Sequence, residues 1–183
     1  MGYNRMLKQL ITLLSTLMLL TACAGSTAPG AGAAQSVDVS GIPAGTFKAS
    51  VTGALTGDFS GIAGYITVEG GGYLLNLSGT EGIVGATVSI ILPSDAAAGT
   101  FTPQPYPDSF DAAANRVTAV GLSFSALAAD HNAVDVYTAL TNASLTLQSL
   151  DPMTGAFTFT AALEDGRAVT VTGTFNQIPV VQM

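Results

Sequence analysis

Few side chains in this 183-residue chain are suited to catalysis: it has one histidine, His131, one cysteine, Cys23, and 12 carboxylates. His131 lies beside Asp130, but a Ser-His-Asp site also needs a serine on a strained strand-to-helix turn, and no serine here has that sequence context. Zinc requires about four nitrogen or sulfur ligands, more than one histidine and one cysteine supply. The sequence therefore predicts no catalytic residues and no metal ligands, and we interpret His131 as an exposed loop residue.

The carboxylates leave two kinds of chemistry open, because hard cations bind oxygen ligands and a glycosidase needs only two carboxyl groups. Their spacing singles out no pair, however, and includes no calcium loop of the D-x-D-x-D-G kind. Asp151 and Asp165 are explained by turns between strands. We expect no cofactor, with a calcium ion between the loops at 108–111 and 130–135 as an open alternative without assigned ligands.

The best candidates for ligand binding are Tyr106 and Phe110, which flank Pro107 on a long connection between strands. Loops often carry binding residues, and aromatic rings on them offer platforms to sugars. The absence of tryptophan weakens the case for sugars, and aromatic residues of alternating strands pack more often in the core. We therefore restrict the predicted ligand-binding residues to Tyr106 and Phe110.

The first 22 residues have the pattern of an export signal. Arg5 and Lys8 form a basic segment, and the apolar run LITLLSTLMLL at 10–20 is too short to span a bilayer comfortably. Leu20-Thr21-Ala22-Cys23 then resembles the lipobox of bacterial lipoproteins, in which cleavage precedes a cysteine that receives diacylglycerol. The resemblance implies that Cys23 is lipidated and that the protein resides in the cell envelope, in the outer membrane or on the outer face of the cytoplasmic membrane. The alternative is an ordinary secreted protein with a free thiol at Cys23.

Residues 23–36 are expected to form a flexible tether, because AGSTAPGAGAAQS carries no charge and no large apolar side chain. A single domain follows at 37–183. The mature chain keeps three strong bases against 12 acids, which gives a net charge of −9. Such a surface repels phosphate backbones and anionic headgroups, so we expect no nucleic-acid partner and attachment to the membrane through lipidated Cys23.

Beyond residue 37, apolar and small polar residues alternate as in β-strands, and no 3.6-residue period is sustained. The clearest strands are SLTLQSL at 144–150, AFTFTAAL at 156–163 and a return strand through Val169 and Phe175. Four further strands lie between Phe47 and Leu92. We predict an all-β domain, an antiparallel β-sandwich or flattened barrel of about nine strands, and periodicity does not distinguish these two architectures.

Turn residues separate the strands. Asp165-Gly166 predicts a two-residue type I′ turn, and the run from Asp151 to Gly155 predicts a turn whose glycine tolerates a positive φ. PQPYP at 103–107 is expected to be extended and outside any central strand. Residues 108–115 have room for one short helical turn.

The strands of the C-terminal half resemble a family of bacterial lipoproteins with an all-β domain to which no function is assigned. The likeness rests on the threonine-rich strand at 145–151, the GAFTFTA strand at 155–161 and the closing VTVTGTFN strand at 169–176. An earlier Gly99-Thr100-Phe101 and the opening strand at 47–53 fit the same outline. The resemblance implies the all-β fold, and its motifs describe turns and strand faces without catalytic residues.

We hypothesise a membrane-anchored, non-enzymatic β-domain that binds a protein, a glycan or another envelope component. This hypothesis is favoured by the tether, by the acidic surface and by a sequence in which no catalytic residues are recognised. One alternative is a glycan-binding or glycan-active module, because β-sandwiches on cell surfaces often present binding platforms to glycans. A second alternative is a barrel-type carrier of small ligands, since 48% of the residues are hydrophobic.

Overall fold

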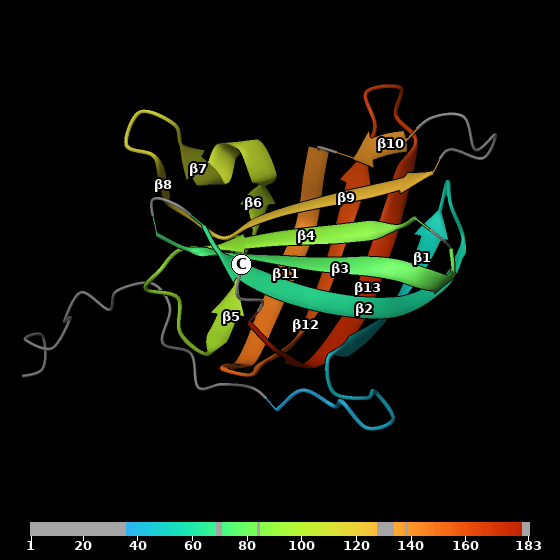
Figure 1. Ribbon diagram of the computed structural model, residues 1–183. Coiled ribbons are helices and arrows are strands. Elements are labelled where there is room, and N and C mark those ends of the chain that lie inside the picture. The colour runs from blue at the N-terminus through green and yellow to red at the C-terminus, as the bar shows by residue number, and fades with distance from the viewer. Residues whose placement is uncertain (1–35, 69–70, 84, 128–133, 138, 181–183) are drawn as a thin grey trace, which may run out of the picture. The chain divides into compact units, whose positions relative to one another are not determined.

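The computed structural model describes residues 36–68, 71–83, 85–127, 134–137 and 139–180 (Figure 1). All of them belong to one compact unit, 31–183. The predicted leader, the tether up to residue 35, Cys23 and His131 lie outside the described residues. In the described part, no helix is long and apolar enough to cross a bilayer.

The described residues form thirteen strands and one short 3-10 helix, so the all-β prediction is confirmed. The seven strands predicted from alternation correspond to β1–β4 and β11–β13. In chain order the elements are β1 (Thr46–Gly53), β2 (Gly57–Thr67), β3 (Tyr73–Gly82), β4 (Thr87–Leu92), β5 (Gly99–Phe101), β6 (Gln104–Pro105), η1 (Tyr106–Ser109), β7 (Phe110–Asp111), β8 (Arg116–Val117), β9 (Gly121–Leu127), β10 (Val134–Tyr137), β11 (Ala139–Leu150), β12 (Met153–Ala162) and β13 (Ala168–Ile178).

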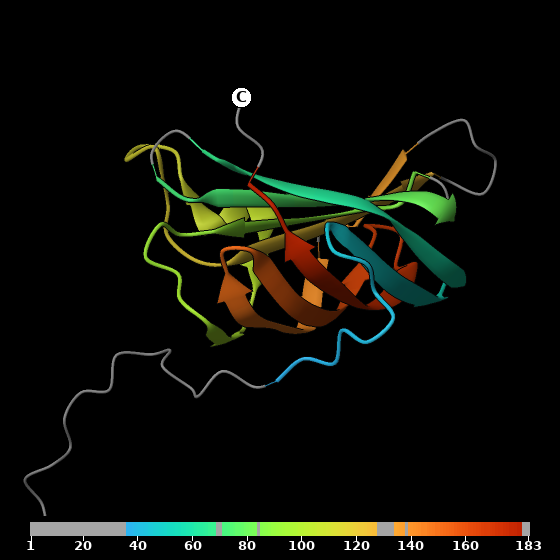
Figure 2. The same cartoon turned by 60° about the horizontal axis from the view of Figure 1, so that its bottom comes forward.

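The long strands join in one antiparallel sheet, in the order β10-β9-β4-β3-β2-β1-β13-β12-β11-β5. This sheet folds over into two layers, with β2, β3, β4, β9 and β10 in the first and β1, β13, β12, β11 and β5 in the second (Figures 1 and 2). The order begins at β10 and ends at β5, so the sheet is not closed into a barrel. Of the two predicted architectures, the structure shows the sandwich-like one.

The chain itself spans the opening between the two layers. β10 pairs with β9 in the first layer, and β11, which starts two residues after β10 ends, pairs with β12 in the second layer. At the other end of the opening, β5 pairs with β11 and β6 pairs in parallel with β9. The segment from β5 to β6 therefore lies across the opening where no ladder joins β9 to β11.

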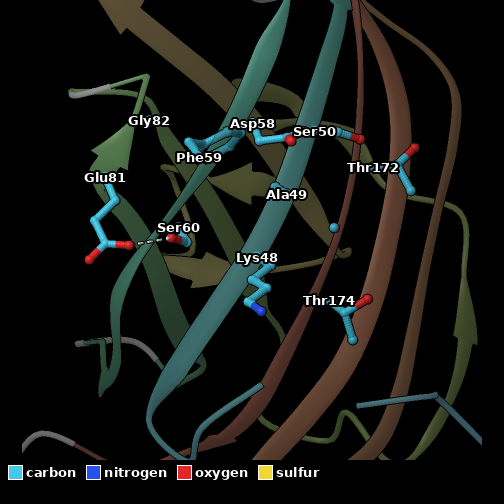
Figure 3. Close-up of a pocket in the computed structure, with 11 residues that line it drawn as sticks. Lys48, Ala49, Ser50, Asp58, Phe59, Ser60, Glu81, Gly82, Thr172 and Thr174 are labelled. Atoms are coloured by element: carbon cyan, nitrogen blue, oxygen red, sulfur yellow. Dashed lines mark hydrogen bonds between the residues drawn. The ribbon is translucent and has the colours of Figure 1, made fainter. Parts of the chain in front are cut away.

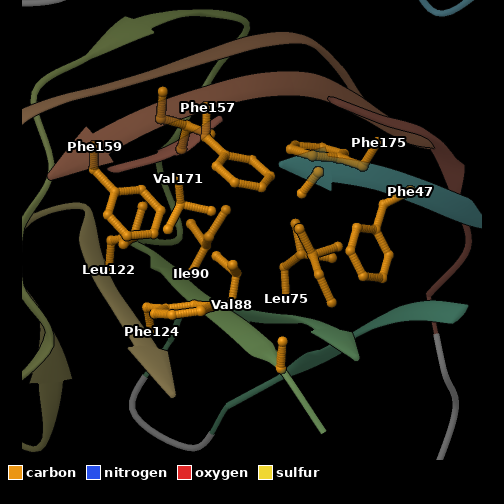
Figure 4. Packing of buried hydrophobic residues seen from close by; sticks show 14 of the residues in the cluster. Phe47, Leu75, Val88, Ile90, Leu122, Phe124, Phe157, Phe159, Val171 and Phe175 are labelled. Atoms are coloured by element: carbon orange, nitrogen blue, oxygen red, sulfur yellow. The ribbon is translucent and has the colours of Figure 1, made fainter. Parts of the chain in front are cut away.

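A core of aliphatic and aromatic side chains fills the space between the layers (Figure 4). Phe124 of the first layer is its centre, because its ring lies 6.1 Å from Phe59, 5.4 Å from Tyr137 and 6.3 Å from Phe159 between centroids. Aromatic pairs of this kind add about 0.5–1.5 kcal/mol each beyond the burial of their area. A chain with a single cysteine has no intramolecular disulfide, so burial must hold the layers together.

The β12–β13 hairpin forms as predicted, but the predicted type I′ turn is wrong. The loop has three residues, 164–166: the Gly166 N–H donates to the Leu163 carbonyl at 3.0 Å, and the Leu163 N–H donates to the Arg167 carbonyl at 2.9 Å. Within the loop only Gly166 has a positive φ, of 86°, whereas a type I′ turn requires two such residues. Glu164 joins the turn, and Gly166 occupies the left-handed position that follows it.

Two further local predictions are corrected. The 3-10 helix η1 begins at Tyr106, so residues 103–107 are not extended throughout, and the helical turn expected within 108–115 lies at Tyr106–Ser109. Proline at the start of a helical turn is favourable because its φ is already helical. Gly155 is not a turn glycine: it is buried within β12, where a Cβ would lie 2.4 Å from the Thr146 carbonyl oxygen.

We expect Phe124→Ala to lower the free energy of unfolding by about 3–5 kcal/mol. Removal of the Phe124 ring would leave a cavity, and the rings from both layers that surround it cannot all move inward to fill it. Urea unfolding followed by circular dichroism measures this loss. Ser123→Ala, the outward-facing neighbour on the same strand, is the control and should change stability by less than about 0.5 kcal/mol. Equal midpoints for the two variants would contradict the role assigned to Phe124.

Candidate functional site

Outward-facing hydroxyl side chains cover the second layer. Alternate residues of a strand face opposite sides of the sheet, so the residues between the buried ones on β1, β11, β12 and β13 face solvent. The pairing register aligns them in three rows across the strands. These rows, which we call the threonine face, are Thr141-Thr160-Thr170-Thr52, Ser144-Thr158-Thr172-Ser50, and Thr100-Thr146-Ala156-Thr174-Lys48.

Hydrogen bonds between neighbouring strands order part of this face. Thr158 and Thr172 join their hydroxyls at 3.0 Å, as do Thr160 and Thr170 at 3.1 Å. Threonine is also stiff at χ1 because it is branched at Cβ, so its hydroxyl and methyl groups have few alternative positions. Over β11, β12 and β13 the rows contain no charged side chain, although the chain carries 12 acidic residues.

A groove of about 560 Å³ crosses β13, β1, β2 and β3 at the edge of this face (Figure 3). We call it the Lys48 groove; its lining includes Lys48, Ser50, Asp58, Glu81 and Thr172. A second hollow, of about 250 Å³, lies over β11, β12 and β13. Both hollows are lined by residues 172–174, so they meet over β13.

The charged groups of the Lys48 groove already have polar neighbours. Lys48 Nζ donates to the Gly41 carbonyl at 3.1 Å, and the Ser60 hydroxyl donates to Glu81 Oε2 at 3.2 Å. Asp58 lies opposite Ser50 in the β1–β2 register and is exposed. The groove thus offers two carboxylate acceptors, one cation and several hydroxyls that both donate and accept, a set suited to a polar ligand with hydroxyl groups of its own.

The segment before β1 runs along one border of the threonine face. The Val37 N–H donates to Gln148 Oε1 of β11 at 3.1 Å, and Asn176 Nδ2 of β13 donates to the Ile42 carbonyl at 2.7 Å. The segment therefore passes from β11 toward β1 alongside the third row, two residues beyond Thr146 and Thr174 on their strands. Through the bond between Gly41 and Lys48, it also positions the cation of the groove.

The structure places the predicted pair Tyr106 and Phe110 away from the Lys48 groove. Tyr106 begins η1 and Phe110 begins β7, and both are half-buried. The helix packs against β9 at Gly121, where a Cβ would lie only 2.0 Å from the Ser109 hydroxyl. Their ligand-binding role stays a prediction, and the two residues lie on a packed segment and not on a free loop.

Arg167 forms ion pairs on both sides of the opening of the sheet. Its Nη1 lies 2.9 Å from Asp135 Oδ2 of β10, and its Nε lies 2.8 Å from Asp165 Oδ2 in the β12–β13 loop. The Arg167 backbone N–H and side chain hold the pKa of Asp165 below its ordinary value of 3.8. The arginine ties the edge strand of the first layer to a hairpin of the second.

The structure keeps Asp135, the described carboxylate of the second loop, apart from the 108–111 loop. η1 packs on β9 at Gly121, whereas Asp135 is paired with Ala126, and five residues of strand span about 17 Å. Asp111 Oδ1 accepts two backbone N–H groups of its own loop. Among the described residues no group of three potential metal ligands occurs, and residues 130–133 of the second loop lie outside them.

Comparison of the chain with models of protein families, with curated protein sequences and with solved structures gives no match. Function must therefore be argued from the geometry of the site itself.

Sequence reasoning alone does not find this site. Alternation identifies Thr158 and Thr160 as the polar side of one strand, but it does not say which strands lie beside it. The charged groups Lys48, Asp58 and Glu81 come from three different strands and meet through the β1–β2 and β2–β3 ladders. The feature of the sequence that does point to this site is the uncharged, threonine-rich polar side of the last three strands.

Replacing Arg167 should make stability less sensitive to acid. A carboxylate whose folded-state pKa is lowered stabilises the fold above its ordinary pKa of 3.8 and loses that contribution as pH falls through the lower value. Arg167→Gln keeps the backbone N–H, the larger cause, and removes the side-chain hydrogen bond and the charge. Its melting temperature should therefore lie below that of the wild type at pH 7, and the difference should shrink from about pH 5 to about pH 2. Arg116→Gln, which removes the same charge elsewhere, is the control. A difference that grows toward low pH would refute this account.

Proposed function

We propose that this chain is a lipid-anchored, non-enzymatic protein of the bacterial cell envelope, related to the lipoprotein family that its strands resemble. Cys23 is acylated in the outer membrane or on the outer face of the cytoplasmic membrane, and residues 23–36 tether the β domain. The domain binds an envelope component at the Lys48 groove and the threonine face.

The observation that carries this proposal is a groove that continues into an uncharged hydroxyl surface on an acidic protein. Charged residues on sheet faces keep a domain soluble, whereas the centres of binding surfaces are depleted of charge. Thr158, Thr160, Thr170 and Thr172 occupy outward positions, of which three are exposed and that of Thr160 is half-buried, and none of the four carries a charge. Binding of a partner explains this uncharged surface better than a requirement for solubility does.

The filled interior favours binding at the surface over transport of a small ligand inside a barrel. Leu145, Phe157, Phe159 and Val171 are at most 2% exposed and pack between the layers with the rings of Figure 4. A bound molecule in this space would have to displace core side chains.

A glycan-active module is the second candidate, because Asp58 and Glu81 line the same groove. Two carboxyl groups that flank a sugar suffice for acid and base catalysis. Both side chains are exposed, however, and Glu81 accepts a hydrogen bond from Ser60. A role in binding sugar hydroxyls needs no further assumption, and we therefore keep the non-enzymatic proposal first.

Lipidation is tested by metabolic labelling of cells with an alkyne fatty acid. The full chain should incorporate the label and sediment with membranes, while Cys23→Ala should lose both properties because it lacks the acceptor thiol. Ser26→Ala, three residues further along the tether, should behave as the wild type. Equal labelling of Cys23→Ala and wild type would rule out the anchor.

The binding site is tested by thermal shift, using the full chain in detergent with glycan, lipid and protein fractions of the envelope and with calcium. A ligand of the folded state raises the melting temperature by mass action. Ser50→Arg, on the floor of the Lys48 groove, should abolish the rise, and Ser123→Arg on the first layer should preserve it. No rise with any fraction, or a rise that survives Ser50→Arg, would reject the proposed site.

A further inference from the structure

We infer that the Lys48 groove and the hollow that joins it bind a neutral, hydroxyl-rich polysaccharide chain, which lies across the strands from β11 to β3. This inference rests on the proposed function and adds the chemical class of the ligand.

The two hollows form one elongated site. They share residues 172–174 of β13, and together they extend from Ser144 on β11 to Glu81 on β3. Strands of a sheet are about 4.8 Å apart, so these five strand intervals span about 24 Å along the sheet. A site of this length, open along its side, suits a stretch of polymer better than one compact small molecule.

The hydroxyls of the site recur at regular intervals. The central row places Ser144, Thr158, Thr172 and Ser50 on successive strands, and the next row lies about 6.7 Å away along each strand. Each hydroxyl donates one hydrogen bond and accepts others, as sugar hydroxyls do. The threonine methyl groups can also pack against the C–H faces of sugar rings.

The charges of the site are complementary to a neutral chain with hydroxyl donors at one end. Asp58 and Glu81 accept hydrogen bonds from hydroxyls, and bonds to ionised acceptors are stronger than those between neutral groups. Lys48 offsets part of their charge, and the remainder of the site is uncharged. An anionic polymer would meet these carboxylates and the net charge of −9 carried by residues 37–183, which repel it.

A protein partner fits this surface less well. Binding energy between proteins concentrates in large anchors such as tryptophan, tyrosine and arginine, and the three rows present none of these residues. The aromatic rings that line the hollows, Phe59 and Phe157, are 2% exposed and belong to the core. Without stacking rings, each contact with a sugar is weak, and avidity would come from many anchored copies on one polymer.

The test is retention of the full chain, purified in detergent, on insoluble neutral polysaccharides: cellulose, chitin and starch granules, with calcium alginate beads as the anionic comparison. At least one neutral polysaccharide should deplete the wild-type chain from solution, and alginate should not. Thr172→Glu, at the point where both hollows meet, should weaken retention at least tenfold. Thr158→Val, which keeps the branched shape without the hydroxyl, should weaken it severalfold.

Thr87→Glu is the matched control, because Thr87 is an outward-facing threonine on β4 of the opposite layer. It should bind as the wild type does, and the melting temperatures of all variants show whether they are folded. Failure of all three neutral polysaccharides to retain the wild type overturns the inference; the proposed function then stands only if a lipid or protein fraction gives the Ser50-dependent thermal shift. Equal retention of Thr172→Glu and Thr87→Glu also overturns it, because the polysaccharide would then bind elsewhere.

Discussion

Burial of one face of a folded-over sheet is the constraint on which the rest of this structure depends. No intramolecular disulfide supports the fold, and the contact between Phe124 of the first layer and Phe159 of the second joins the layers through the core. A shift of one residue in the register of β12 would move Phe159 outward and Thr158 inward. The core therefore fixes the outward positions of the hydroxyl rows as firmly as it fixes its own side chains.

The chain itself covers the open edge of the sheet, although no pairing of strands closes that edge. β10 pairs within the first layer and β11 within the second, and the segment from β5 to β6 lies across the other end of the opening. Arg167 adds an electrostatic tie through Asp135. Exposed ion pairs contribute little to folding stability, so this ion pair orients β10 more than it stabilises the fold.

The Lys48 groove lies at the bend where the sheet passes from one layer to the other, between β1 and β2. The bend brings Lys48 of the second layer near Asp58 and Glu81 of the first, and it leaves a hollow over the backbone between them (Figure 3). Charge is thereby confined to one end of a surface that is otherwise lined by hydroxyls. This arrangement is why we favour a neutral, hydroxyl-rich ligand over a charged one.

The sequence by itself determined the β class, the seven strands that correspond to β1–β4 and β11–β13, and the hairpin at Gly166, because alternation and turn glycines act within a few residues of the chain. It did not locate β9, the seven-residue strand that carries Phe124. Local patterns failed at Tyr106, where η1 packs against Gly121 of β9, a contact that no local pattern reveals. Only the tertiary structure decided between sandwich and barrel and assembled the groove. Both depend on which strands become neighbours: β1 lies between β2 and β13, and that pairing of the first strand with the last is set by burial of the whole core and not by any local signal.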